Sequence, residues 1–183
     1  MDTHINETVR SILSSWGKTN IYESITTSND QGWTHACICL VDDEQTLRKI
    51  DSTTIIESIK KGDHMENILF APLSFSIECV KDMSSDPNND TVFIIGFSLP
   101  KHKMDEFPQD WFKATPYMSS CMGYKRATVY KVLDENAIFS FFNIAVWSSL
   151  DSWKQAIATE ESKQAHAHQG YVDRTPFIGK QVN

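Results

Sequence analysis

The sequence predicts an α+β protein built from antiparallel sheet with helices on one face. Two observations indicate this class. The β-prone run FSFFNIAVW (139–147) passes directly into a helical segment at 150–169, and residues 33–61 repeat that strand-to-helix pattern. In addition, the strands and helices expected in residues 91–183 follow the order βαββαβ. This order is the ferredoxin-like arrangement, in which both helices cover the same face of one antiparallel sheet.

Residues 91–183 contain every element of that order. Strands are expected at 91–99, 125–134 and 139–147, helices at 102–121 and 150–169, and a short last strand within 171–182. Ser149 is a candidate N-cap of the second helix, although Asp151 or Ser148 could serve instead, and Gly170 is a candidate stop signal. Pro176 places the last strand at a sheet edge, because proline has no backbone N–H to donate to an inner ladder.

The first part of the chain shows the same order without its first strand. A helix, two strands, a helix and a strand are expected at 7–16, 19–27, 33–41, 42–61 and 73–81. Residues 33–50 match residues 139–156 in pattern, which favours an internal duplication, although any two ββα units of similar length align comparably. We therefore predict a degenerate ferredoxin-like half at 1–81, a linker at 82–90 and a complete domain at 91–183.

The strand 139–147 is apolar on both of its faces. One face carries Phe142, Ile144 and Val146 and is expected to pack on the helices. The other face carries Phe141, Asn143, Ala145 and Trp147, and is expected to pack on a second sheet formed by residues 1–81. The two units would then pack sheet to sheet around a sheltered chamber. The Asn143 amide would project into this chamber, because an amide that is removed from water needs a hydrogen-bond partner.

The composition excludes several classes of protein. The 183 residues are 40% apolar and 11% aromatic, which is enough for a packed core. The net charge of −7, with Lys and Arg scattered, argues against a nucleic-acid partner. No apolar run reaches the roughly 18 to 20 residues that span a bilayer, so we expect a soluble, cytoplasmic protein with no membrane partner. The four cysteines lack CxxC spacing and are expected to be free thiols, and no metal site is expected.

The segment F-x-F-F-N-I-A-V-W-x-S-x-x-S-W-x-x-A (139–156), followed by T-E-E-S-K-Q-A-H (159–166), resembles the antibiotic biosynthesis monooxygenase superfamily. The resemblance covers residues 91–183. It implies that two ferredoxin-like units pair through their sheets into an α+β barrel, usually as a homodimer. With a degenerate first copy, one chain could build that barrel alone.

The resemblance also implies residues of a site. In the cofactor-independent members that turn polyketide anthrones into quinones, an Asn and a Trp four residues later hold the substrate, and Asn143 and Trp147 stand at matching positions. The further Tyr and Arg of those pockets have no match. In the haem-degrading branch a helical His ligates iron, which His166 would match, whereas the Trp and Asn of that branch are unmatched.

These residues predict a monooxygenase-like protein that oxidises a small aromatic substrate, of the quinol or polyketide type, with O₂ and no bound cofactor. Asn143 would donate to the developing oxyanion, and His166 or His168 would supply the base. The residues expected to hold the flat ring are Tyr130, Phe141, Trp147 and Trp153.

Two alternatives stay open. The chain can be a non-catalytic ligand-binding or assembly module of the same fold, in which Asn143 bonds a backbone group and the tryptophans are core residues. It can also be a haem-binding or haem-degrading protein that uses His166.

Overall fold

The computed structural model describes residues 3–15, 17–25, 33–41, 45–46, 51–63, 69 and 71–182. The helices are α1 (Thr3–Ser14), α3 (Ser52–Asp63), α4 (Phe107–Lys113), α5 (Thr115–Ser120), α6 (Leu150–Ile157) and α7 (Glu160–His166), with short 3-10 turns η1 (Lys101–Lys103) and η2 (Ala167–Gln169). The strands are β1 (Lys18–Ser24), β2 (His35–Leu40), β3 (Leu73–Val80), β4 (Thr91–Ser98), β5 (Tyr124–Val132), β6 (Phe141–Trp147) and β7 (Asp173–Val182). Within these ranges, no helix is both long and apolar enough to cross a membrane.

The seven strands form one antiparallel sheet in the order β2-β1-β7-β4-β6-β5-β3. Strands β7, β4, β6 and β5 make up the C-terminal ferredoxin-like unit. The N-terminal strands extend this unit at both ends, since β1 pairs with β7 and β3 pairs with β5. The expected ferredoxin-like α+β fold is confirmed. The last strand of each half of the chain pairs with the hairpin of the other half.

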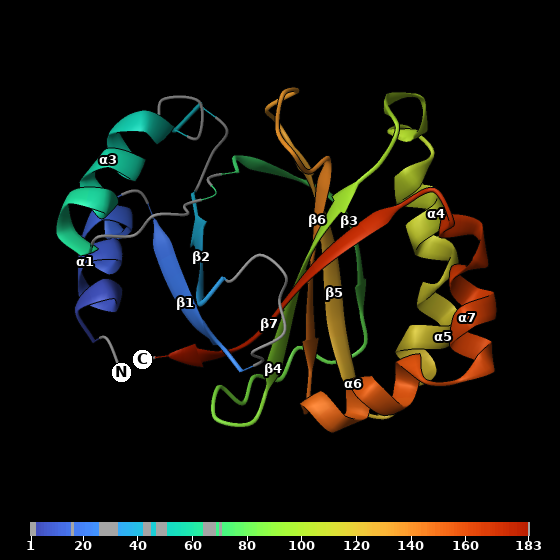
Figure 1. The fold of residues 1–183 in the computed structure, drawn as a ribbon. Coiled ribbons are helices and arrows are strands. Elements are labelled where there is room, and N and C mark those ends of the chain that lie inside the picture. The colour runs from blue at the N-terminus through green and yellow to red at the C-terminus, as the bar shows by residue number, and fades with distance from the viewer. Residues whose placement is uncertain are drawn as a thin grey trace.

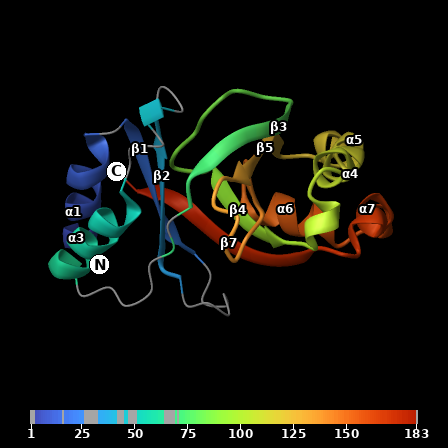
Figure 2. The ribbon, with the colours of Figure 1, turned by 90° about the horizontal axis from the view of Figure 1, so that it is seen from above.

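The helices lie in two groups on opposite sides of the molecule. In Figure 1, α1 and α3 lie beside β1 and β2, whereas α4 to α7 lie on the other side of the curled sheet. Figure 2, seen from above, shows the same separation and the curvature of the strands. The curl lets the sheet enclose one apolar layer on its inner face while α4 to α7 cover its outer face.

Two of the expected helices are each split into a pair. The segment 150–169 forms α6 and α7, because a second N-cap interrupts it: Ser149 Oγ accepts from the Ser152 N–H at 3.1 Å, and Thr159 Oγ1 accepts from the Ser162 N–H at 3.0 Å. The segment 102–121 forms α4 and α5, each with proline in its first turn, where the missing N–H has no cost. Ser149 is therefore the N-cap that the sequence predicts.

Strand β7 differs from the short edge strand that the sequence predicts. It has ten residues and lies inside the sheet between β4 and β1. β1 pairs only with the end of β7, from Gly179 to Val182, whereas Pro176 pairs with Ile95 of β4. Pro176 thus sits where β7 is paired on one side in the described part of the chain, which is why its missing N–H is tolerated.

The two faces of β6 are covered in the opposite way from the expectation. Phe142 and Val146 belong to the inner apolar cluster with Tyr22 of β1, on which Trp33 and Ile38 of the N-terminal half pack. The opposite face joins the cluster beneath the C-terminal helices, whose members include Phe107, Trp111, Phe141, Ala145, Trp147 and Ala156. The expectation that Asn143 lies between two sheets is therefore wrong. Its side chain faces α4 to α7.

Candidate functional site

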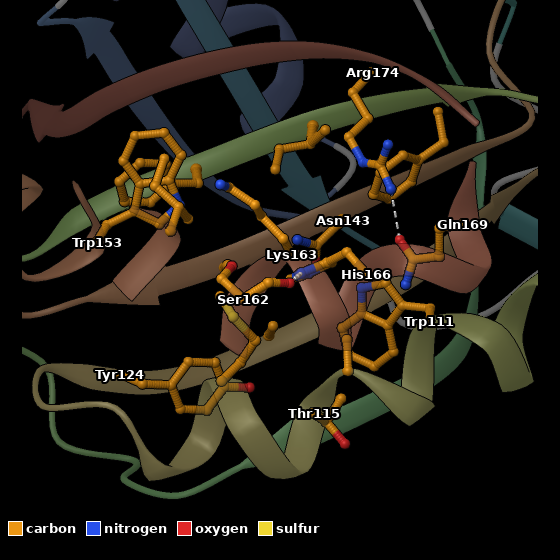
Figure 3. A pocket seen from close by; sticks show the side chains of 18 of the residues that line it. Trp111, Thr115, Tyr124, Asn143, Trp153, Ser162, Lys163, His166, Gln169 and Arg174 are labelled. Carbon is orange, nitrogen blue, oxygen red and sulfur yellow. Dashed lines mark hydrogen bonds between the residues drawn. The ribbon is translucent and has the colours of Figure 1, made fainter. Parts of the chain in front are cut away.

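A cavity of about 480 Å³ lies between the C-terminal sheet and helices α4 to α7 (Figure 3). This volume is in the range of small-molecule sites. Most of its wall is apolar and includes the aromatic side chains of Phe93, Phe97, Trp111, Tyr124, Trp147 and Trp153. Its polar lining includes Asn143, Ser162, Lys163, His166, Gln169 and Arg174. The site is therefore a mainly aromatic chamber with a few polar groups.

Asn143 stands in the middle of β6, between Ile95 of β4 and Val129 of β5, and is 7% exposed. Its side-chain Oδ1 is buried and has no hydrogen-bond partner in the described part of the chain. An unpaired buried acceptor of this kind costs about 1–3 kcal/mol. We expected Asn143 to donate to an oxyanion, but its unpaired atom is an acceptor. It is suited to accept a hydrogen bond from a hydroxyl group of a bound molecule.

His166, at the end of α7, is half-buried and lines the cavity. Its Nδ1 lies 2.8 Å from the Ser162 carbonyl oxygen. Because a carbonyl oxygen only accepts, Nδ1 carries the hydrogen, and Nε2 of the neutral ring keeps its lone pair. Burial lowers the pKa of His166, and the positive charge of Arg174 lowers it further. The ring is therefore neutral at pH 7, which is the protonation state in which it can act as a base.

The second candidate base, His168, is placed elsewhere. It is outside the cavity lining, and its Nε2 is hydrogen-bonded to the Asp110 carbonyl oxygen of α4. Nε2 must donate in this bond, since the carbonyl only accepts. His168 therefore connects η2 to α4, and of the two histidines His166 alone lines the cavity.

Two of the four predicted ring-binding residues line the cavity. Trp147 is 1% exposed and packs edge-on against Tyr124, with ring centroids 5.3 Å apart. Trp153 of α6 packs on Phe93 at 4.5 Å. Both tryptophans belong to the cavity lining, so each combines a core contact with a surface that a ligand can touch.

The other two predicted ring-binding residues do not line the cavity. Phe141 is on the correct face of β6, but its ring packs against Phe107 at 4.8 Å inside the core. Tyr130 lies on the opposite face of the sheet, where its ring meets Phe75 at 6.5 Å. The reason is strand alternation, since the adjacent Val129 belongs to the cluster beneath the helices.

Several lining residues were not predicted from the sequence, among them these four: Trp111, Tyr124, Gln169 and Arg174. Tyr124 donates to the Cys79 carbonyl oxygen at 2.8 Å, and burial raises its pKa, so it stays protonated. None of the four had a local signal, because each comes from a different element and only the folded sheet and helices bring them together.

The described ranges contain no group of three His, Cys, Asp or Glu side chains that could hold a metal ion. Cys37, Cys39, Cys79 and Cys121 are free thiols.

No protein-family model and no curated protein sequence matches this chain. Solved structures do match it. An anthrone oxidase-like protein superposes with a TM-score of 0.71 at 12% identity, over 100% of this chain and 87% of its own. A candidate monooxygenase from Fusobacterium nucleatum gives 0.65 at 10% identity, over 98% and 83%. A major regulator of staphylococcal pathogenesis gives 0.59 at 8% identity, over 97% and 92%.

At these identities the likeness shows the fold alone. This chain shares its fold with these structures, and the shared fold agrees with the one that the sequence resemblance implies. The matches span essentially the whole chain, so the shared fold includes the N-terminal strands and helices as well as the C-terminal unit.

The lowered pKa of His166 predicts how stability depends on pH. Its folded pKa lies below the ordinary value of 6.5, so the unfolded chain binds the proton more tightly. Stability is therefore unaffected by this group above pH 6.5 and falls as the pH drops from there toward the folded pKa. We expect His166→Gln to lose less stability than the wild type between pH 7.5 and pH 5, measured by urea unfolding. Equal losses would contradict the assignment.

Proposed function

We propose that this protein is a monooxygenase that oxidises a small hydroxylated aromatic substrate with O₂, without a bound cofactor, in the cavity beneath α4 to α7. The observation that carries the proposal is an aromatic chamber lined by two residues that each have a polar atom able to accept a hydrogen bond. These atoms are the unpaired Oδ1 of Asn143 and the unprotonated Nε2 of neutral His166.

The chemistry needs few protein groups. A base removes a proton from an electron-rich phenol or anthrone, and the resulting anion passes one electron to O₂. The two radicals combine into a peroxide, which loses water and leaves a quinone. For an anthrone, C₁₄H₁₀O and O₂ become C₁₄H₈O₂ and H₂O, so one oxygen atom enters the product. His166 fits the role of the base, Asn143 Oδ1 accepts a hydrogen bond from a substrate hydroxyl, and the aromatic wall excludes water.

The proposal is supported by the fold shared with an anthrone oxidase-like protein. The identity of 12% carries no information about the substrate, so the substrate class follows from the cavity of this chain. The same fold in a regulator favours a second candidate, a binding module without turnover. A haem-binding role through His166 is a third candidate, because Nε2 is free of hydrogen in the neutral ring.

Oxygen uptake and isotope labelling test the proposed reaction. We expect the protein to accelerate O₂ consumption by 1,8-dihydroxyanthrone, and one ¹⁸O atom from ¹⁸O₂ to appear in the quinone. Ile157→Trp narrows the cavity from a partly exposed position, at 39% exposure, and should slow the reaction. Ile138→Trp adds the same bulk at a position outside the lining, 75% exposed, and should have no effect. A rate that is unchanged by Ile157→Trp would refute the assignment of this cavity.

A further inference from the structure

The charges around the cavity differ from those of the protein as a whole. The chain carries a net charge of −7, yet the described lining contains Lys163 and Arg174 and no Asp or Glu. Lys163 is already paired, since its Nζ lies 3.0 Å from Glu160 and its side chain is 69% exposed. Arg174 is therefore the cation whose charge remains to be explained.

The guanidinium of Arg174 is held by neutral partners. Its Nη2 donates to Gln169 Oε1 at 2.7 Å, and its Nη1 donates to the Val172 carbonyl oxygen at 3.2 Å. In the described part of the chain no carboxylate lies within ion-pairing distance of it. Asp173 is the nearest acidic neighbour in sequence, but adjacent residues of a strand point to opposite faces. Two neutral acceptors use two of the five donors, and the charge of Asp173 interacts with the guanidinium only at a distance, without an ion pair.

A buried amide fixes the position of this cation. Gln169 is 2% exposed, and its Nε2 donates to the Asp110 carbonyl oxygen at 3.1 Å. That bond and the bond from Arg174 require opposite ends of the amide, so the orientation of Gln169 is set. Arg174 as a whole is exposed, which places it at the mouth of the cavity, while partial burial of the guanidinium lowers its pKa. Figure 3 shows Arg174 and Gln169 together at one end of the cavity and Trp153 toward the other.

We propose that the cavity selects a hydroxylated aromatic carboxylate: the carboxylate binds Arg174 at the mouth, and the hydroxyl donates to Asn143 Oδ1 inside. This inference deepens the proposed function, because it names the substrate class of the same site. Arg174 provides a planar fork that matches a carboxylate, and Asn143 provides the unpaired acceptor. The aromatic wall between them contacts a flat ring.

Calorimetric titration under nitrogen tests the selection without turnover. The probes are 6-hydroxy-2-naphthoate, 2-naphthol, which lacks the carboxylate, and 2-naphthoate, which lacks the hydroxyl. Charge-assisted hydrogen bonds predict that the wild type binds the hydroxy acid at least about tenfold more tightly than 2-naphthol. Arg174→Gln should abolish this preference, and Asn143→Leu should abolish the preference over 2-naphthoate.

Arg126→Gln is the matched control. It removes the same charge from β5 at a position outside the cavity lining, and it should leave the preference intact. Thermal unfolding checks that each variant is folded, and Arg174→Met serves the same comparison if Arg174→Gln unfolds. Equal binding of the hydroxy acid and 2-naphthol by the wild type would overturn the inference, as would an equal loss in Arg126→Gln.

The two proposals can fail separately. Arg174-dependent binding of the acid without O₂ consumption would keep the inference and refute the oxidation. Oxidation of neutral anthrones with no Arg174-dependent preference for the acid would keep the oxidation and refute the inference.

Discussion

Asn143→Leu is expected to make the protein more stable and to remove most of its turnover. Leucine removes a buried oxygen that has no partner in the described part of the chain, and its side chain has the same branching and the same number of heavy atoms as that of asparagine. The gain should be about 1 kcal/mol, which raises the melting temperature by about 2–4 °C for a chain of this length. The loss of a hydrogen bond to the reacting molecule should lower kcat about 100-fold.

The control for this prediction is Thr91→Val. Thr91 Oγ1 is also buried without a partner in the described part of the chain, but it lies outside the cavity lining. This substitution should likewise stabilise the protein, and it should leave kcat unchanged. Thermal unfolding and O₂ uptake are measured on both variants. If Asn143→Leu lowers the melting temperature, the amide has a structural partner and the assignment of Asn143 to ligand binding is wrong.

Trp147→Ala is expected to cause the largest loss of stability. Trp147 is 1% exposed at the end of β6 and packs edge-on against Tyr124. Removing a fully buried tryptophan costs about 3–5 kcal/mol, a large part of the roughly 5–15 kcal/mol that stabilises a protein domain. Urea unfolding should therefore show a much lower midpoint for this variant than for the wild type. A loss below about 1 kcal/mol would show that the ring is not part of the core.

To test whether Trp147 also contacts a ligand, a substitution that keeps the protein folded is needed. Trp147→Phe keeps an aromatic ring against Tyr124 and should remain folded at 25 °C. Because the Trp147 ring also lines the cavity, we expect this variant to raise KM with little change in kcat. Phe141→Leu is a useful comparison, since Phe141 is equally buried but lies outside the lining, and its KM should not change.

The division into a degenerate half at 1–81, a linker at 82–90 and a complete domain at 91–183 stays a prediction, as does a homodimer. The exchange of last strands between the two hairpins agrees with a duplicated ancestry. It also means that separation of the two halves would expose the edges of both β5 and β7.

The sequence by itself determined the α+β class, the order of strands and helices in residues 91–183, and a helix N-cap within 148–151. These features follow from local rules, because apolar periodicity and capping chemistry act within a few residues. Asn143, Trp147, Trp153 and His166, which the motif indicated, line one cavity, and their role as a site stays a prediction.

Only the tertiary structure decided which side of β6 holds the cavity. Both faces of that strand are apolar, so alternation separates Phe142 from Asn143 without saying whether helices or the N-terminal half cover either face. The same limit explains why Tyr130 was wrongly assigned to the cavity and Arg174 was missed. Arg174 enters the site because β7 pairs with β4 inside the sheet, and long-range strand pairing of this kind leaves no signature in the residues around it.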